Sequence, residues 1–332
     1  MSHLGVRVTF AASAGLGLAL AIFLIGWYGF GAVARSALAL GWGGLLVLVA
    51  LHLVVVVVCG AAWRAVMAPG QRVGILAAAA ARILRDAGGE LLPISPAGGA
   101  VMGARALILA RMPGAPAFAS VVVDLTLELF GQIGFTALGV LVLVRGGWAP
   151  QLATPLLAGL GVAAAAAFGF VIAQHAGMFR MLERFTRRVM LRRETPAMPE
   201  DAGIHEAIGE TYRRHAGILI GLGGHFAGWL ATSLEAWVTL RLIGAPLPFA
   251  AVFALESLTY AVRSAAFFIP SGLGVQEGGY VFLGAIFGLG PEAALALSLA
   301  KRAREVAIGL PALVVWQAIE ARLWRGARVR KA

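Results

Sequence analysis

The sequence contains no asparagine and a single cysteine in 332 residues. The absence of asparagine leaves no acceptor for N-glycosylation, and one cysteine excludes both a disulfide framework and a cysteine-based metal cluster. Cys59 lies inside an apolar run, so we expect it to pack as a small buried hydrophobic side chain. Charge is also scarce, because only 13% of the residues are Asp, Glu, Lys or Arg.

Hydrophobic residues make up 60% of the chain, which lies above the usual range of soluble domains. This composition predicts a polytopic membrane protein. The formal net charge of +11 is also a feature of nucleic-acid-binding proteins. The Lys and Arg residues, however, are spread among apolar runs, which predicts a basic membrane flank and no nucleic-acid partner.

Six segments are apolar over about the 20 residues that a bilayer crossing needs. They run from Val8 to Val33, Gly41 to Met67, Phe118 to Val144, Leu152 to His175, Gly217 to Ile243 and Val306 to Trp324. The first apolar run is longer than that of a signal peptide, so we expect residues 1–40 to hold a retained span. The predicted fold class is therefore an all-α polytopic membrane protein, with one integral membrane domain over 1–332.

Two further regions, 73–111 and 247–290, each consist of a helix-like stretch, a Pro/Gly elbow and a second short helix. Each half is short for a crossing of its own, so both regions are predicted to be re-entrant helical hairpins. Irregular backbone is tolerated inside a bilayer only where protein or a water-filled cavity covers it. The leading site candidate is therefore the second elbow, which contains Pro270, Gly272, Gly274 and Glu277.

The distribution of arginine predicts the orientation. If both termini are cytoplasmic and the hairpins enter from opposite sides, most arginines lie on the cytoplasmic side, as the positive-inside rule requires. Residues 41–145 and 217–324 then form two inverted repeats, an architecture typical of transporters. The remaining parts are a span at 152–175, a basic cytoplasmic linker at 178–215 and a basic tail at 325–332. Within the linker, residues 178–196 have one apolar and one basic face, which favours a helix in the headgroup plane over a solvated segment.

Ionisable side chains inside apolar segments are costly and usually face a cavity or a partner, so each is a site candidate. Polar residues recur on one helical face in three places: Asp124, Glu128 and Gln132; Glu256, Tyr260 and Arg263; and His225, Thr232, Glu235 and Thr239. Buried salt bridges that only fix the helix order are an open alternative for His225, Glu235 and Glu305. A functional role is favoured for Arg263 and Glu277, because arginine can bind a lipid phosphate and a glutamate in a low-dielectric site can exchange protons.

Enzyme motifs are incomplete in this chain. Ser298 and Lys301 match S-x-x-K without its partner motifs, and the segment from Gly272 to Glu277 resembles a dinucleotide loop that lacks its third glycine. Neither lysine lies in a Walker A loop, and His225 has no second metal ligand nearby in the sequence. No catalytic residue, cofactor or metal is predicted, and an enzymatic role is left uncertain.

The segments PSGLGVQEGG and LSLAKRARE, together with LLPISPAGGAVMGAR upstream, resemble the flippase-like family of lysylphosphatidylglycerol synthase transmembrane regions. Within that family, the hopanoid-biosynthesis-associated branch is the most similar. The resemblance implies that Pro270, Gly272, Gly274, Glu277 and Arg302 match the second motif, and Pro93, Gly98, Gly99 and Arg105 the first. The family's first motif commonly has an acidic residue where this chain has Ala100, and Glu90 lies on the other side of the first elbow.

The function predicted from residues and resemblance is a lipid translocase of the cell inner membrane, with a hopanoid-related or phospholipid cargo. The expected substrate-binding residues are Glu90, Arg105, Asp124, Glu128, Arg263, Pro270, Gly272, Gly274, Glu277 and Arg302. The alternative is a membrane-embedded lipid-modifying enzyme, with Glu277 or Asp124 as general base, or its accessory subunit. Expected partners are membrane lipids, lipid-biosynthesis enzymes and a second copy of the chain. A third alternative is a scaffold for partner enzymes, which fits the close-packing spacing of Gly217, Gly221, Gly224 and Gly228, although such glycines are also common inside any helical bundle.

Overall fold

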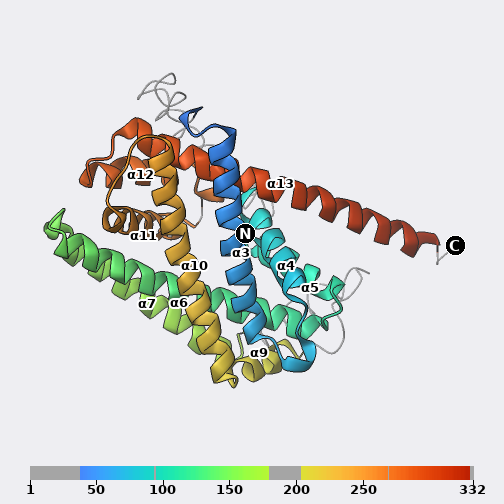
Figure 1. Cartoon of the computed structure of the whole chain (residues 1–332). Coiled ribbons are helices and arrows are strands. Elements are labelled where there is room, and N and C mark those ends of the chain that lie inside the picture. The colour runs from blue at the N-terminus through green and yellow to red at the C-terminus, as the bar shows by residue number, and fades with distance from the viewer. Residues whose placement is uncertain (1–37, 93–94, 179–202, 268, 330–332) are drawn as a thin grey trace, which may run out of the picture. The chain divides into compact units, whose positions relative to one another are not determined.

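The computed structural model describes residues 38–92, 95–178, 203–267 and 269–329 (Figure 1). These ranges are built from helices and turns and contain no β-strand, which confirms the all-α prediction. The predicted first span at Val8 to Val33 lies outside the described residues. The same holds for the predicted headgroup-plane helix from residue 179 onward.

Five of the described helices are long and apolar enough to cross a membrane. They are α3 (Gly41–Val66), α6 (Gly114–Arg145), α7 (Ala153–His175), α10 (His215–Leu242) and α13 (Pro291–Val329). Each covers one of the predicted spans to within one residue. Their apolar residues are not confined to one face, which is typical of helices surrounded by protein and lipid. The chain is therefore a multi-pass membrane protein.

Helix α13 begins earlier than the sequence suggested. Its apolar span was expected from Val306, after the charged run Lys301 to Glu305, whereas the helix starts at Pro291. Proline is favoured at the first position of a helix, because its missing N–H has no helical acceptor there. The charged run thus lies in the interior of one continuous 39-residue helix.

The two predicted elbows are real breaks between helices. The first lies between α4 (Ile75–Glu90) and α5 (Ser95–Leu109), and the second between α11 (Phe249–Ala265) and α12 (Val275–Ile286). The four helices have 16, 15, 17 and 12 residues. At about 1.5 Å per residue each is shorter than the ~30 Å hydrocarbon core. Their re-entrant placement and inverted orientation remain predictions.

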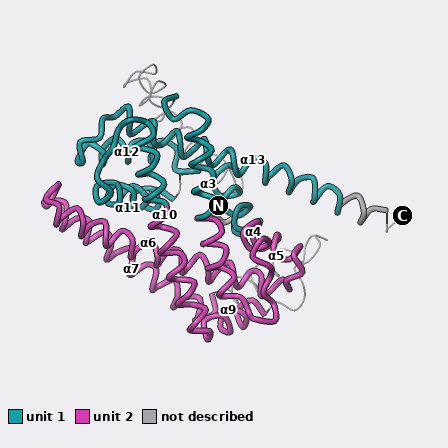
Figure 2. The backbone as a smooth tube through the Cα atoms, in the orientation of Figure 1, with its two compact units in different colours: residues 1–54, 82–102, 232–332 teal, residues 55–81, 103–231 magenta. Residues whose placement is uncertain are grey.

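The chain forms two compact units (Figure 2). Unit 1 comprises residues 1–54, 82–102 and 232–332, and within it α12 packs against both α11 and α13. Unit 2 comprises residues 55–81 and 103–231, and within it α6 packs against α7 and the short helix α9 (Ile204–Tyr212). Both helix breaks lie in unit 1.

The glycine stripe of α10 is used inside unit 2. A Cβ atom added to Gly224 would lie 2.6 Å from the Cβ of Ala62, and one added to Gly228 would lie 2.6 Å from the Sγ of Cys59. These glycines therefore let α10 approach α3 closely. Cys59 is buried in this contact, as its apolar surroundings predicted. The stripe thus gives no support for a partner protein.

Candidate functional site

The second elbow is formed by a run of left-handed backbone. After α11 ends at Ala265, the short 3₁₀ turn η3 (Pro270–Gly272) leads to α12. Ser271, Gly272 and Gly274 have φ values of 56°, 57° and 74°. Glycine adopts such values without steric cost, so the two glycines allow the chain to reverse here.

Glu277 caps the helix that follows this elbow. Its carboxylate accepts a hydrogen bond from the backbone N–H of Gly274 at 2.8 Å, three residues earlier. The hydroxyl of Ser298 donates to the same carboxylate at 2.9 Å, and the Nε of Arg302 at 2.8 Å. The side chain is 3% exposed. Hydrogen bonds to both oxygens and the N-terminal position in α12 stabilise the ionised form of Glu277.

Arg302 connects α13 to the elbow backbone. Its guanidinium contacts Glu277 and also donates to the carbonyl oxygens of Ser271 at 3.2 Å and Gly272 at 3.4 Å. The Arg302 side chain remains 19% exposed. One arginine therefore fixes the carbonyl groups that the elbow leaves without helical partners.

Arg263 connects the two elbows to each other. Its guanidinium forms an ion pair with Glu90, the last residue of α4, and donates to the side-chain oxygen of Gln276 at 3.1 Å. The hydroxyl of Ser271 donates to the backbone carbonyl of Glu90. The Arg263 and Glu90 side chains are 13% and 32% exposed. We call Glu90, Arg263, Gly272, Glu277 and Arg302 the elbow site.

The first elbow contributes backbone packing as well as Glu90. A Cβ atom added to Gly99 would lie 2.3 Å from the carbonyl oxygen of Arg85 and 2.7 Å from the backbone nitrogen of Gly89. Real Cβ atoms do not approach other atoms this closely, so α4 and α5 are in direct backbone contact. Ala100 replaces the expected acidic residue, and Glu90 is the acidic group that this elbow supplies to the elbow site.

The sequence matches a known family over most of its length. The family model described as the lysylphosphatidylglycerol synthase TM region matches residues 14–312. The chain belongs to this family. Membership places it among membrane proteins of lipid metabolism or translocation. No curated protein and no solved structure showed significant similarity to it.

Three of the five second-motif residues, Gly272, Glu277 and Arg302, belong to the elbow site. Of the expected substrate-binding residues, Pro270, Gly274 and the five members of the elbow site lie in unit 1. Arg105, Asp124 and Glu128 lie in unit 2. There, Asp124 forms a buried pair with His225 at 2.7 Å, and the backbone carbonyl of Glu128 accepts from Trp229 at 3.3 Å. The family motif residue Pro93 is outside the described residues.

Sequence reasoning missed several polar contacts of this family member. Ser271, Gln276 and Ser298 all contact members of the elbow site, yet none was singled out as a binding residue. Two signals were present. Gly274 and Glu277 have the spacing of a capping box, and Ser298, Lys301, Arg302 and Glu305 follow the i, i+3, i+4, i+7 pattern of one helical face.

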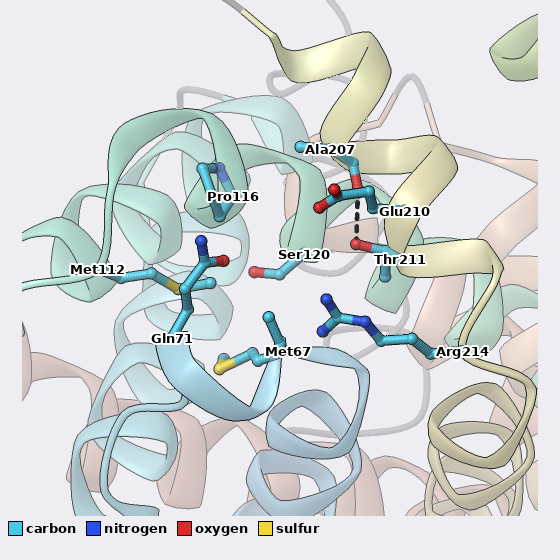
Figure 3. Close-up of a pocket in the computed structure, with 10 residues that line it drawn as sticks. Met67, Gln71, Met112, Pro116, Ser120, Ala207, Glu210, Thr211 and Arg214 are labelled. Atoms are coloured by element: carbon cyan, nitrogen blue, oxygen red, sulfur yellow. Dashed lines mark hydrogen bonds between the residues drawn. The ribbon is translucent and has the colours of Figure 1, made fainter.

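A small pocket in unit 2 is a separate feature of this family member (Figure 3). Gln71, Ser120 and Arg214 point into it, and Thr211 on its wall donates a hydrogen bond to the carbonyl oxygen of Ala207 at 2.8 Å. The cavity volume is about 10 Å³. That is about the space of one water molecule, too little for a lipid headgroup.

Proposed function

We propose that this protein is a lipid translocase that moves a polar lipid, hopanoid-related or phosphorylated, across the cell inner membrane. The headgroup binds at the elbow site. Family membership supports a role with lipids, and the contacts at the elbow site support the choice of translocation over chemistry.

One observation carries the proposal: Arg263 and Arg302 are held at the meeting point of two helix breaks and are partly exposed. A guanidinium presents several N–H donors in one plane, which matches the oxygens of a phosphate. Each guanidinium is already oriented by a carboxylate, so little order is lost when a headgroup binds. This arrangement suits recognition of an anionic group.

Glu90 adds an acceptor beside these donors. Its side chain is 32% exposed although it pairs with Arg263. A carboxylate there can accept hydrogen bonds from hydroxyl groups or pair with an amine. The elbow site therefore offers both donors and acceptors, the combination that a headgroup with a phosphate and hydroxyl or amino groups requires.

Glu277 serves best as a counter-ion. Gly274, Ser298 and Arg302 all donate hydrogen bonds to its carboxylate, and it is nearly fully buried. A group held in this way is a weak general base, because it must give up these donors before it accepts a proton. Its role in the proposal is to hold Arg302 in place until the headgroup arrives.

The test is lipid movement in proteoliposomes. Purified protein is reconstituted with fluorescent phosphatidylglycerol, and exposure of the label at the outer surface is followed by chemical quenching. We expect Arg263→Ala and Glu277→Gln to slow the movement at least tenfold. Arg213→Ala and Glu210→Gln, which change exposed side chains in unit 2, serve as controls at the wild-type rate. A wild-type protein no faster than empty vesicles, or full activity in both variants, would contradict the proposal.

A lipid-modifying enzyme is the second candidate. The pair of Asp124 and His225 at 2.7 Å favours it, because a carboxylate beside an imidazole is a common acid–base combination. Comparison of lipid extracts from cells with and without the protein separates the two functions. A missing lipid product supports the enzyme, whereas unchanged lipid chemistry with an altered distribution between leaflets supports the translocase.

A further inference from the structure

A second polar layer lies one helical turn from the elbow site on the same two helices. Tyr280 follows Glu277 by three residues on α12, and Lys301 follows Ser298 by three residues on α13. Residues three apart lie on the same helical face. Because Ser298 contacts Glu277, the Tyr280 and Lys301 side chains form the next contact between α12 and α13. We call Glu256, Tyr260, Tyr280 and Lys301 the lysine layer.

Three of these groups form a closed triangle. The Nζ of Lys301 donates to a Glu256 oxygen and to the hydroxyl of Tyr280, the latter at 2.9 Å. The Tyr280 hydroxyl donates to the other Glu256 oxygen at 2.6 Å. Tyr260 completes the layer with its ring centroid 5.0 Å from Nζ. The triangle joins α11, α12 and α13 through three buried polar side chains.

The layer is shielded from solvent by protein. Lys301 is 1% exposed and Glu256 is fully buried. The charged or titratable groups around it are Arg263 on α11, Glu235 on α10 and Arg304 on α13, and Glu235 is itself paired with Arg304 and with His52 on α3. Among the described residues, Glu256 therefore pairs with one cation, Lys301, and a proton on its carboxylate would change the charge of the pair from zero to plus one.

A buried ion pair is weak evidence for a stabilising role, because apolar residues of similar volume often stabilise a core at least as well. Ionisable groups inside a membrane protein are costly and commonly belong to ion or proton pathways. The triangle lies one helical turn from the elbow site, between the same helices. A change of charge in the lysine layer can therefore alter the packing at the elbow site.

We propose that the lysine layer is the proton-binding site that couples lipid movement to a pH gradient, an inference that rests on the translocase function. A proton from one aqueous side binds the carboxylate of Glu256 and makes it neutral. Lys301 keeps its charge and loses its counter-ion, and the contact of α12 with α11 and α13 weakens. The turn that holds Glu277 against Arg302 then opens to the headgroup. Release of the proton on the other side restores the triangle.

The experiment imposes a pH gradient on proteoliposomes that contain fluorescent phosphatidylglycerol and a trapped pH-sensitive dye. For the wild type, we expect the gradient to accelerate lipid movement several-fold and the dye to report proton entry that depends on the lipid. Glu256→Gln fixes the layer without a titratable carboxylate. It should still move lipid without a gradient, but its rate should no longer respond to the gradient.

The double variant Glu256→Gln/Lys301→Met keeps the test decisive if the single variant does not fold. It removes both charges together, so no unpaired buried charge remains. It too should lose the response to the gradient, whereas Glu210→Gln should keep it. A gradient response that persists in the double variant overturns the proposal, as does a wild type that moves lipid equally fast with and without a gradient. Lipid movement no faster than in empty vesicles would instead refute the translocase function itself.

Discussion

Between α4 and α5 the chain reverses with backbone against backbone, whereas between α11 and α12 it reverses around charged side chains. Gly88 and Gly99 leave no room for a side chain at the first elbow. At the second, Arg302 and Glu277 occupy the space that the turn leaves. The first elbow is therefore closed by backbone contacts, and the second is held together by side-chain hydrogen bonds.

This difference bears on the asymmetry of the motifs. Ala100 stands where the first motif of the family commonly has an acidic residue, and the first elbow contributes one carboxylate to the elbow site. The second hairpin with α13 contributes Arg263, Glu277 and Arg302. If the site is ionic, most of its charge comes from the second elbow.

The largest loss of stability is expected when a side chain is added at the backbone contact of the first elbow. Gly99→Val places two methyl groups beyond a Cβ that already lies 2.3 Å from the carbonyl oxygen of Arg85. Because backbone must move, the loss of stability should reach about 3 kcal/mol or more, at the upper end for overpacking. Thermal unfolding in detergent measures it. Gly43→Ala, with open space around its Cβ, is the control and should be neutral or stabilising.

The next largest loss of stability is expected when the ion pair between Arg302 and Glu277 at the second elbow is removed. Arg302→Met removes the counter-charge of Glu277 and the donor to two carbonyl groups, which should cost about 2–4 kcal/mol. The double variant Glu277→Gln/Arg302→Met should be less destabilised than the sum of the single variants. Additive losses would show that the two side chains do not act as a pair.

A smaller loss of stability is expected from substitutions at glycines with left-handed backbone. Gly272 has φ of +57° and Gly288 has φ of +76°, but only Gly272 has a neighbour, the Arg263 side chain, within 3 Å of its added Cβ. Substitution by alanine should cost about 1–2 kcal/mol of strain at either position. Only Gly272→Ala should also slow lipid movement, since it displaces Arg263. Equal slowing in Gly288→Ala would argue against this role of the turn.

The smallest effect concerns one hydroxyl. Ser298 accepts a hydrogen bond from Gln276 and donates one to Glu277, so Ser298→Ala should cost about 1 kcal/mol. Ser233 is also buried, and its hydroxyl has no partner among the described residues. Ser233→Ala should therefore be neutral or slightly stabilising. Thermal unfolding of both variants under one condition checks the difference.

The helices could be predicted because bilayer crossing demands long apolar runs, and the elbows because proline and glycine interrupt such runs. The start of α13 could not be placed, since charges at Lys301 to Glu305 normally mark the end of a span. Here they are paired with residues of α10, α11 and α12. Hydropathy contains no information about such partners.

The candidate site could be predicted only in part, because sequence patterns do not reveal contacts between residues that are far apart in the chain. Glu277 and Arg302 were found from the local motif, but the pairing of Arg263 with Glu90 joins residues far apart in the sequence. Nothing in one sequence distinguishes that pair from Asp124 and Glu128, which carry charge in equally apolar helices but lie in unit 2. The capping role of Glu277 was visible in its spacing from Gly274 and was overlooked because serine or threonine usually begins that motif.

Pro311 lies inside the long helix α13 and separates it into two parts. It lies between the turns that hold Ser298 to Glu305 and the exposed apolar turns that include Val314 and Ile319. A proline inside a helix has no N–H for the carbonyl of the residue four positions earlier, here Ala307. The rod is therefore most easily bent at this turn. The two parts of α13 on either side of Pro311 can therefore differ in direction without the loss of a further backbone hydrogen bond.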